Sequence, residues 1–157
     1  MNAAEIMSRP AITVREGTTL EEIARTLLEH RIGSVPVVDE DGKLVGIVSE
    51  SDFAGKERGV PFTAFHAPNI LGQWITKDGV ERIYEASRRM TARDIMTSPV
   101  ETLTEDTTVT DIVRRMIRQD LKRLPVVRGG RPVGMVTHHD LLRVVAPAAA
   151  SATDGGR

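Results

Sequence analysis

Gly46-Ile47-Val48-Ser49-Glu50-Ser51-Asp52 is repeated, 88 residues further along the chain, as Gly134-Met135-Val136-Thr137-His138-His139-Asp140. The similarity extends upstream, because residues 7–38 align with residues 96–127 at a constant offset of 89, with 11 of 32 positions identical. An internal duplication constrains the architecture before any local element is assigned. Two copies predict a pseudo-symmetric pair, and the seam between two such halves is a common place for a small ligand to bind.

The composition argues against several classes of protein. A length of 157 residues fits one domain or two small ones, and a net charge of −1 gives no electrostatic basis for binding nucleic acid or a membrane surface. The chain has no cysteine, which rules out disulfides and thiolate metal sites. Residues 1–5 do not resemble a signal peptide, and no apolar stretch approaches the roughly 20 residues of a membrane helix. We therefore expect a cytoplasmic protein.

Each copy contains the same succession of local patterns. Apolar residues spaced i, i+3, i+4, i+7 predict helices over residues 20–28 and 109–117. Two β-branched runs follow in each copy and predict strands, at residues 35–38 and 44–48 and again at residues 124–127 and 132–136. Each copy is therefore predicted as β-α-β-β-α. The whole chain is predicted as an α+β fold in which the two repeats pack as a pseudo-twofold pair.

Two details of these elements are also predicted. Thr18 and Glu21 have the spacing of a capping box at the start of the first long helix. Pro36 and Pro125 fall inside predicted strands, and we expect edge positions for them because proline cannot donate a backbone hydrogen bond.

The Gly-x-x-Ser/Thr-x-x-Asp endings and the Pro-Val-Val strands before them resemble the CBS domain family, a tandem β-α-β-β-α module. The resemblance covers residues 3–54 and 92–146, which we assign as the two repeats. Residues 55–91 are then an insert, and residues 147–157 are expected to form a disordered tail. The resemblance implies a homodimer that binds an adenine nucleotide in the cleft between the repeats. It also implies regulation of an attached or partner protein, without catalysis.

Ser49 with Asp52, and Thr137 with Asp140, lie where a predicted strand is followed by a helix. This spacing has two interpretations. In the structural one, the hydroxyl caps the helix and the acid interacts with the positive end of its dipole. In the functional one, the free N–H groups of the helix bind a phosphate and the carboxylate accepts the hydroxyls of a ribose. The family resemblance implies the ribose role for Asp52 and Asp140.

The second copy carries more positive charge around this motif. His138 and His139 stand at the predicted helix start, and Lys122 and Arg123 precede the strand. Cations at a helix N-terminus are unfavourable unless an anion binds there, and a guanidinium group matches the shape of a phosphate. Together with Thr137 they are the candidate phosphate ligands, a role that the resemblance implies for positions 122 and 123. In the alternative interpretation they are solvated surface charges.

The first copy provides a weaker candidate site. It would use Ser49, Ser51 and Asp52, and the neighbouring Glu50 would repel a phosphate. We predict that this site binds nucleotide weakly, binds a less charged adenosine derivative, or stays empty.

The family pattern also implies which residues contact the base. The adenine bound at Asp140 is expected to touch Ile12 and the segment Ile32, Gly33 and Ser34 of the first copy. The small side chains at positions 33 and 34 leave room for a flat ring.

The sequence shows no catalytic or metal-binding constellation. Adjacent histidines such as those at positions 138 and 139 point about 100° apart on a helix and do not readily chelate one ion. We therefore predict a stand-alone regulatory module that senses AMP, ADP or ATP, with no other cofactor and no metal. The alternative is a nucleotide-independent dimerisation or protein-interaction module, with the aromatic residues of the insert as its docking surface: Phe62, Phe65 and Trp74.

Overall fold

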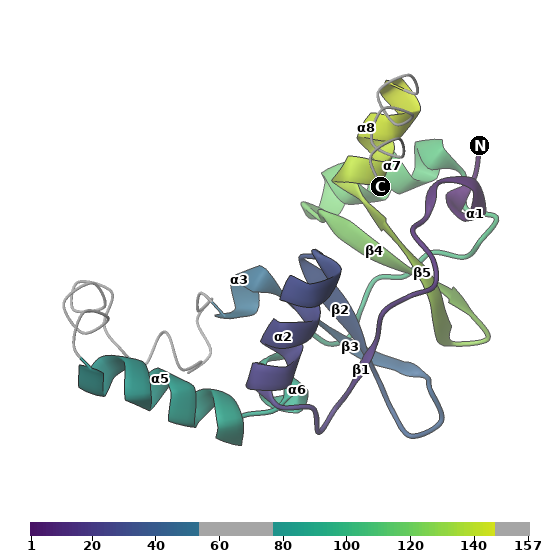
Figure 1. Cartoon of the computed structure of the whole chain (residues 1–157). Helices are drawn as coiled ribbons and strands as arrows, with labels where there is room; N and C mark the ends of the chain where they lie inside the picture. Colours follow the sequence, from purple (N-terminus) through teal and green to yellow (C-terminus); the bar gives the residue numbers. More distant parts are fainter. Residues whose placement is uncertain (54–76, 147–157) are drawn as a thin grey trace. The chain divides into compact units, whose positions relative to one another are not determined.

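The computed structural model describes residues 1–53 and 77–146, and the chain forms two compact units (Figure 1). Unit 1 comprises residues 1–12 and 101–157, and unit 2 comprises residues 13–100. Each unit combines helices with a small sheet, which confirms the predicted α+β class. The predictions for Phe62, Phe65, Trp74 and the tail concern positions outside the described residues. Among the described helices, none is long and apolar enough to cross a membrane.

Unit 2 is built on a three-stranded sheet in the order β1-β2-β3. β1 (Val14–Arg15) runs parallel to β2 (Ser34–Val38), and β2 runs antiparallel to β3 (Leu44–Ser49). The long helix α2 (Leu20–His30) buries Leu20, Ile23 and Leu27 of the apolar stripe predicted from its spacing, whereas Leu28 at the end of that stripe is exposed. The other described helices of this unit are α3 (Glu50–Phe53), α5 (Lys77–Arg89) and α6 (Ala92–Ile95).

Unit 1 repeats this plan with a two-stranded sheet, in which β4 (Arg123–Arg128) runs antiparallel to β5 (Arg131–Thr137). Its helices are α1 (Ala3–Ile6), α7 (Val109–Gln119) and α8 (His138–Val145). They enclose one core of buried aliphatic side chains: Ala3, Met7, Leu103, Ile112, Met116, Leu124, Val126 and Val136. Ala3 and Met7 come from the start of the chain, so this core joins both ends of the sequence.

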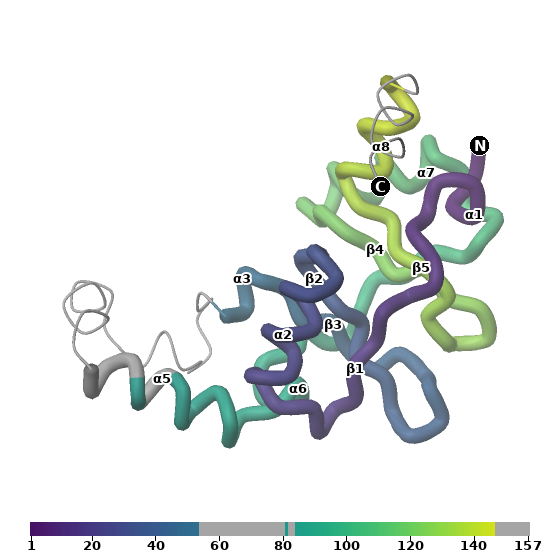
Figure 2. Tube along the Cα trace, in the orientation of Figure 1, coloured from purple at the N-terminus to yellow at the C-terminus, as the bar shows by residue number. Residues whose placement is uncertain are grey.

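The opening segment of each sequence repeat lies on the sheet of the other repeat. Ser8 exchanges two backbone hydrogen bonds with Met135 of β5, at N···O distances of 2.9 and 3.0 Å. Thr97 does the same with Ile47 of β3, at 2.9 and 3.1 Å. Figure 2 shows the purple N-terminal trace running beside β5. The compact units therefore differ from the sequence repeats by an exchange of their first residues.

This exchange requires glycine in both strands. A Cβ atom built on Gly134 would lie 2.5 Å from Sδ of Met7 and 2.9 Å from the carbonyl oxygen of Ser8. A Cβ atom built on Gly46 would lie 2.5 Å from Sδ of Met96. The repeated glycine of the Gly-x-x-Ser/Thr-x-x-Asp motif thus makes room for the repeated methionine that follows each opening helix.

The capping box of α2 lies one residue later than predicted. Thr19 Oγ1 accepts a hydrogen bond from the N–H of Glu22 (3.3 Å), and the Glu22 carboxylate accepts one from the N–H of Thr19 (3.1 Å). The prediction of Thr18 with Glu21 is wrong because Thr18 Oγ1 instead accepts a hydrogen bond from the N–H of Arg15 and closes the preceding turn.

The expectation of edge strands is met for Pro125 only in that β4 belongs to a two-stranded sheet, because Leu103 forms an isolated bridge along the outer side of β4, and it is wrong for Pro36. β2 lies between β1 and β3 in its sheet. Pro36 is tolerated there because its partner Ile47 directs its N–H and C=O groups toward Thr97, on the outer side of β3. On the other side of β2, the pairing with β1 begins only at Val37, so no ladder bond needs an N–H from Pro36.

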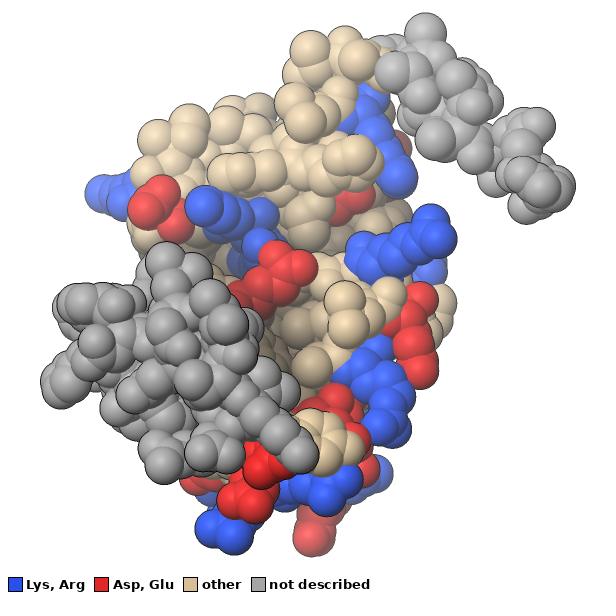
Figure 3. All heavy atoms as spheres, turned by 60° about the vertical axis from the view of Figure 1, so that its left-hand side comes forward, with Lys and Arg blue, Asp and Glu red and all other residues tan. Residues whose placement is uncertain are grey.

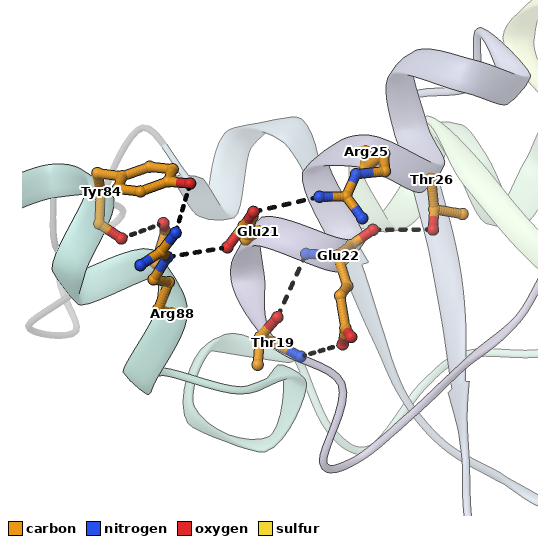
Figure 4. Close-up of polar contacts among 8 residues, drawn as sticks. Thr19, Glu21, Glu22, Arg25, Thr26, Tyr84 and Arg88 are labelled. Carbon is orange, nitrogen blue, oxygen red and sulfur yellow. Dashed lines mark hydrogen bonds and ion pairs between the residues drawn. The ribbon is translucent and has the colours of Figure 1, made fainter.

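The end of α5 is attached to the start of α2 by a polar cluster (Figure 4). Arg88 lies over the ring of Tyr84, 4.2 Å from its centroid, and donates a hydrogen bond of 2.7 Å to its hydroxyl. The same guanidinium group lies 3.4 Å from Glu21, which also pairs with Arg25. The Tyr84 hydroxyl and, to a lesser degree, Glu21 raise the pKa of Arg88 above its ordinary value. These contacts fix the last turn of α5 just before the chain enters α6.

Candidate functional site

Asp140 is a buried carboxylate at the start of α8, only 3% exposed. Its Oδ2 accepts hydrogen bonds from the backbone N–H of Thr137 (2.8 Å) and from Oγ1 of the same residue (2.9 Å). Its Oδ1 accepts one long hydrogen bond from Oγ of Ser8 (3.4 Å). A buried charge is tolerated only when it is well hydrogen-bonded, and three donors from two segments meet that need here.

These contacts confirm the capping interpretation of the motif, and they are compatible with the ligand-binding interpretation. Thr137 supplies two donors to a single oxygen of Asp140, so that oxygen belongs to the helix cap. A carboxylate has about four acceptor positions in total. The second oxygen, Oδ1, can therefore accept further hydrogen bonds, and its bond from Ser8 is weak. Recognition of a ligand hydroxyl needs an acceptor of this kind.

Four of the predicted phosphate ligands lie around the first turn of α8. The carbonyl oxygen of Lys122 accepts a hydrogen bond from the N–H of His138 (3.1 Å), and Arg123 is the cross-strand partner of Thr137. The side chains of Lys122, His138 and His139 are exposed, and Arg123 is half-buried. The structure therefore brings the basic residues of the second copy to the N-terminal end of α8, beside Asp140.

The first copy forms the corresponding arrangement in unit 2. Asp52 Oδ2 accepts hydrogen bonds from the N–H of Ser49 (2.7 Å) and from its Oγ (3.2 Å). Oγ of Ser49 also lies 2.8 Å from Oγ of Ser51. Asp52 is half-buried, whereas Asp140 is buried, and the exposed Glu50 occupies the position that His138 takes in the second copy. The two sites thus share the cap and differ in burial and charge.

The residues expected to contact the base are divided between the units. Ile12 belongs to unit 1, and Ile32, Gly33 and Ser34 belong to unit 2. Ser34 is buried and is the cross-strand partner of Ser49, while the carbonyl oxygen of Gly33 accepts a hydrogen bond from the N–H of Glu50 (3.0 Å). The segment 32–34 therefore lies beside the Asp52 motif of its own unit. Its contact with an adenine bound at Asp140 stays a prediction.

Ser8 is a site residue that the sequence reasoning missed. It lies far from the motif in sequence, and helical or strand periodicity does not report which sheet an opening segment joins. One signal was available, because Ser8 aligns with Thr97 and the hydroxyl group thus recurs at equivalent positions of the two copies.

The charged side chains are spread without a patch of one sign on the face shown in Figure 3, where Lys and Arg lie among Asp and Glu with uncharged surface between them. Within the described part of the chain, no three His, Asp or Glu side chains cluster in a way that would hold a metal ion.

Comparison with known proteins adds the family context. Residues 3–58 and 92–147 match the model of a family described as CBS domain. An uncharacterized protein of Methanopyrus kandleri is 33% identical over 92% of this chain, and the chain spans 62% of the length of that relative.

Two solved structures are similar over most of the chain. The CBS domain of a CBS domain containing membrane protein from Sphaerobacter thermophilus is 43% identical, with a TM-score of 0.76 and coverage of 91% of this chain and 86% of that one. The CBS domain pair of protein MJ0100, solved in complex with 5′-methylthioadenosine and S-adenosyl-L-methionine, is 28% identical, with a TM-score of 0.68 and coverage of 94% and 98%.

Proposed function

The chain belongs to the CBS domain family, and from this premise we propose that it is a regulatory module that binds an adenosine nucleotide and passes its presence to a partner protein by a change of conformation. The observation that carries the proposal is Asp140, a buried carboxylate with one oxygen committed to the cap of α8 and the other held, among the described residues, by Ser8 alone. Ligand binding shifts a conformation only where the ligand prefers one state.

We assign the ribose to the second oxygen of Asp140. A ribose hydroxyl is a stronger donor to this position than Ser8 at 3.4 Å, because a well-formed O–H···O⁻ bond is several tenths of an ångström shorter. Replacing one hydroxyl by another keeps the buried charge satisfied throughout binding. The family resemblance implies a ligand bound between the repeats, and we keep Ile12 with Ile32, Gly33 and Ser34 as the proposed contacts of the base.

We assign the phosphate to the basic residues at the start of α8. Backbone N–H groups and the positive end of the helix dipole favour an anion there, and Lys122, Arg123 and His139 add side-chain hydrogen-bond donors. His138 and Thr137 lie at the same helix end. This set favours a phosphorylated adenosine over a neutral one at the Asp140 site.

The Asp52 site is proposed to favour ligands with less negative charge. Glu50 stands where the second copy has His138, and a carboxylate at that position opposes a phosphate. The CBS domain pair of MJ0100 is complexed with 5′-methylthioadenosine and S-adenosyl-L-methionine, neither of which carries a phosphate. Ligands of this kind are the proposed occupants of the site formed by Ser49, Ser51 and Asp52.

One observation favours a second candidate function, a nucleotide-independent interaction module. Within the protein Asp140 already has three hydrogen-bond donors, which is a complete set for a helix-capping role. In that case the motif is structural in both copies, and regulation would depend on protein contacts alone.

Calorimetric titration with AMP, ATP and 5′-methylthioadenosine separates these functions. The wild-type chain is expected to bind AMP or ATP at about one site per chain, and Asp140→Ala is expected to abolish that binding. Asp94→Ala is the matched control, because Asp94 accepts the same two hydrogen bonds from Thr91 at the start of α6 and is not a proposed ligand. Thermal unfolding of both variants reports the loss of the cap.

A second variant keeps the proposal testable if Asp140→Ala does not fold. Lys122→Ala removes an exposed side chain and is expected to weaken binding of AMP and ATP without changing binding of 5′-methylthioadenosine. Absence of binding by the wild-type chain at millimolar concentrations of all three ligands would reject the nucleotide proposal and support the interaction module.

A further inference from the structure

A polar hollow of about 400 Å³ lies along one flank of α7, entirely within unit 1. Its described lining residues are all charged or carry a side-chain amide: Glu101, Asp111, Arg114, Arg115, Arg118 and Gln119. Positions 111, 114, 115 and 118 share one face of the helix because they are spaced three and four residues apart. A hollow of this volume can hold a small molecule, and its lining suits one that is polar.

Two of the three guanidinium groups around this hollow are each held through a single nitrogen atom. Nη1 of Arg115 donates hydrogen bonds to the carbonyl oxygen of Thr102 (3.1 Å) and to Oε1 of Glu101 (3.5 Å). Nη1 of Arg114 donates one to Oδ1 of Asp111 (2.6 Å). A guanidinium group has five N–H donors, and the other nitrogens of both groups have no protein partner within the described residues. Both side chains are therefore fixed in place and still able to bind an anion.

The third guanidinium group, that of Arg118, makes no hydrogen bond or ion pair with any described residue, and its side chain is exposed. It lies one helical turn beyond Arg114 and Arg115, and like charges at this spacing destabilise a helix. The negative end of the helix dipole favours a cation in the last turn, but that attraction accounts for one arginine and not for a group of three. An anion among the three side chains would remove the repulsion.

The arginine group is a feature of the second copy alone. In the sequence duplication Arg115 aligns with Thr26, and Arg118 aligns with Glu29. The equivalent helix α2 forms with an uncharged and a negative residue at these positions, so the fold does not require arginine at either. A local charge conflict that the fold does not need is expected where side chains serve a ligand.

We propose that this hollow binds a small phosphorylated sugar or polyol, with the phosphate group between Arg115 and Arg118. Guanidinium forks match the geometry of a phosphate, and charge-assisted hydrogen bonds to it are strong. The carboxylates of Glu101 and Asp111 repel a phosphate, so they direct it toward the Arg118 end of the stripe. At their own end they accept hydrogen bonds from the hydroxyl groups of the ligand. This inference does not depend on nucleotide binding.

Calorimetric titration of the full chain with glycerol 3-phosphate, ribose 5-phosphate and glucose 6-phosphate tests the site. At least one of these compounds is expected to bind, and Arg118→Gln is expected to raise its dissociation constant about tenfold, through loss of a charge-assisted hydrogen bond. Binding should weaken at high salt. Arg143→Gln is the matched control, because Arg143 is an exposed arginine of α8 without a partner among the described residues, and its loss changes the net charge equally. Both variants alter exposed side chains and are expected to fold.

Nuclear magnetic resonance of the arginine Nε–H groups locates the bound phosphate. The signals of Arg115 and Arg118 are expected to shift on titration with the sugar phosphate that binds, and the signal of Arg143 is not. Shifts confined to Arg123 would place the phosphate at the start of α8 and overturn this site. No binding of the three compounds at millimolar concentrations, or equal losses in Arg118→Gln and Arg143→Gln, would also overturn it. Inorganic phosphate that binds as tightly as the sugar phosphates would overturn the assignment of a sugar or polyol.

Discussion

Oγ of Ser8 lies 3.4 Å from Oδ1 of Asp140, although 132 positions separate the two residues in the chain. Ser8 belongs to the opening segment of the first sequence repeat, and Asp140 belongs to the motif that ends the second. The exchange of opening segments brings them together, because Ser8 pairs along its backbone with Met135 at the edge of β5. The candidate site at Asp140 is therefore completed by a residue from the other repeat.

Removal of the Ser8 hydroxyl is expected to cost little stability. Ser8→Ala deletes one long hydrogen bond to a buried carboxylate that keeps two shorter ones, so we expect the free energy of unfolding to fall by about 0.5 kcal/mol, at the low end for such bonds. Urea denaturation measures the change. Thr97→Ala is the matched control, because Thr97 holds the equivalent position and its hydroxyl makes no side-chain hydrogen bond within the described residues. Equal losses in both variants would contradict a role for the Ser8 hydroxyl.

Substitution of the motif glycines by alanine tests how closely each opening segment packs against its sheet. Gly134→Ala places a methyl group against the buried Met7 and against a backbone carbonyl, and we expect it to lower the free energy of unfolding by about 1–3 kcal/mol. For Gly46→Ala the three nearest atoms all belong to the side chain of Met96, whose flexible thioether can shift, so the cost is expected to be smaller.

Gly17→Ala provides the control for these substitutions. No atom lies within 4 Å of a Cβ built there, so the variant is expected to be neutral or slightly stabilising in the same urea titration. A cost for Gly134→Ala no greater than that for Gly17→Ala would mean that the opening segment does not pack against β5.

The duplication and the apolar spacing were sufficient to predict the repeated elements of this fold. The stripes over residues 20–28 and 109–117 fall within α2 and α7, since burial of one helix face imposes that period. The exchange of opening segments was not predictable in the same way, because a short amphipathic segment specifies a buried face and not the sheet that buries it. The cap of α2 was misplaced for a local reason. Thr18 and Thr19 each have a glutamate three positions later, and spacing alone does not distinguish them.

The candidate site was predicted in part. The pairing of Thr137 with Asp140, and of Ser49 with Asp52, follows from the geometry of any helix start with that spacing, and both pairs are confirmed. The difference in burial between Asp140 and Asp52 was not predictable, because it depends on what packs around each helix. Ser8 was not predictable for the same reason, since it reaches the site through tertiary structure.

The ion pair between Arg128 and Glu105 gives unit 1 a pH-dependent contact. Arg128 donates two hydrogen bonds of 2.7 Å to the Glu105 carboxylate, and these lower the pKa of Glu105 below its ordinary value of 4.5. A carboxyl group with a lowered folded-state pKa contributes stability above the unfolded pKa and loses that contribution as the pH falls through the folded pKa. The wild-type chain is therefore expected to lose stability below about pH 4.5 more steeply than Arg128→Gln.

Urea midpoints measured between about pH 3 and pH 7 test this expectation. Lys43→Gln is the control, because Lys43 lies in the corresponding β-turn of unit 2 and its side chain has no acidic partner within the described residues. Parallel pH profiles for the wild-type chain and Arg128→Gln would show that the pair does not influence the titration of Glu105.

The contacts of Arg88 with Tyr84 and Glu21 are expected to keep the last turn of α5 from opening locally. They are expected to add little to the free energy of unfolding of the whole protein. Arg88→Met keeps the apolar length of the side chain and removes both the hydrogen bond to Tyr84 and the ion pair with Glu21. Exposed ion pairs contribute little to global unfolding, but loss of the attachment should favour local opening. Amide hydrogen exchange at residues 84–89 is therefore expected to accelerate several-fold, with little change in α2.

Arg89→Met is the matched control, because the neighbouring Arg89 side chain has no partner within the described residues. Equal exchange rates in the two variants would mean that other contacts hold the end of α5.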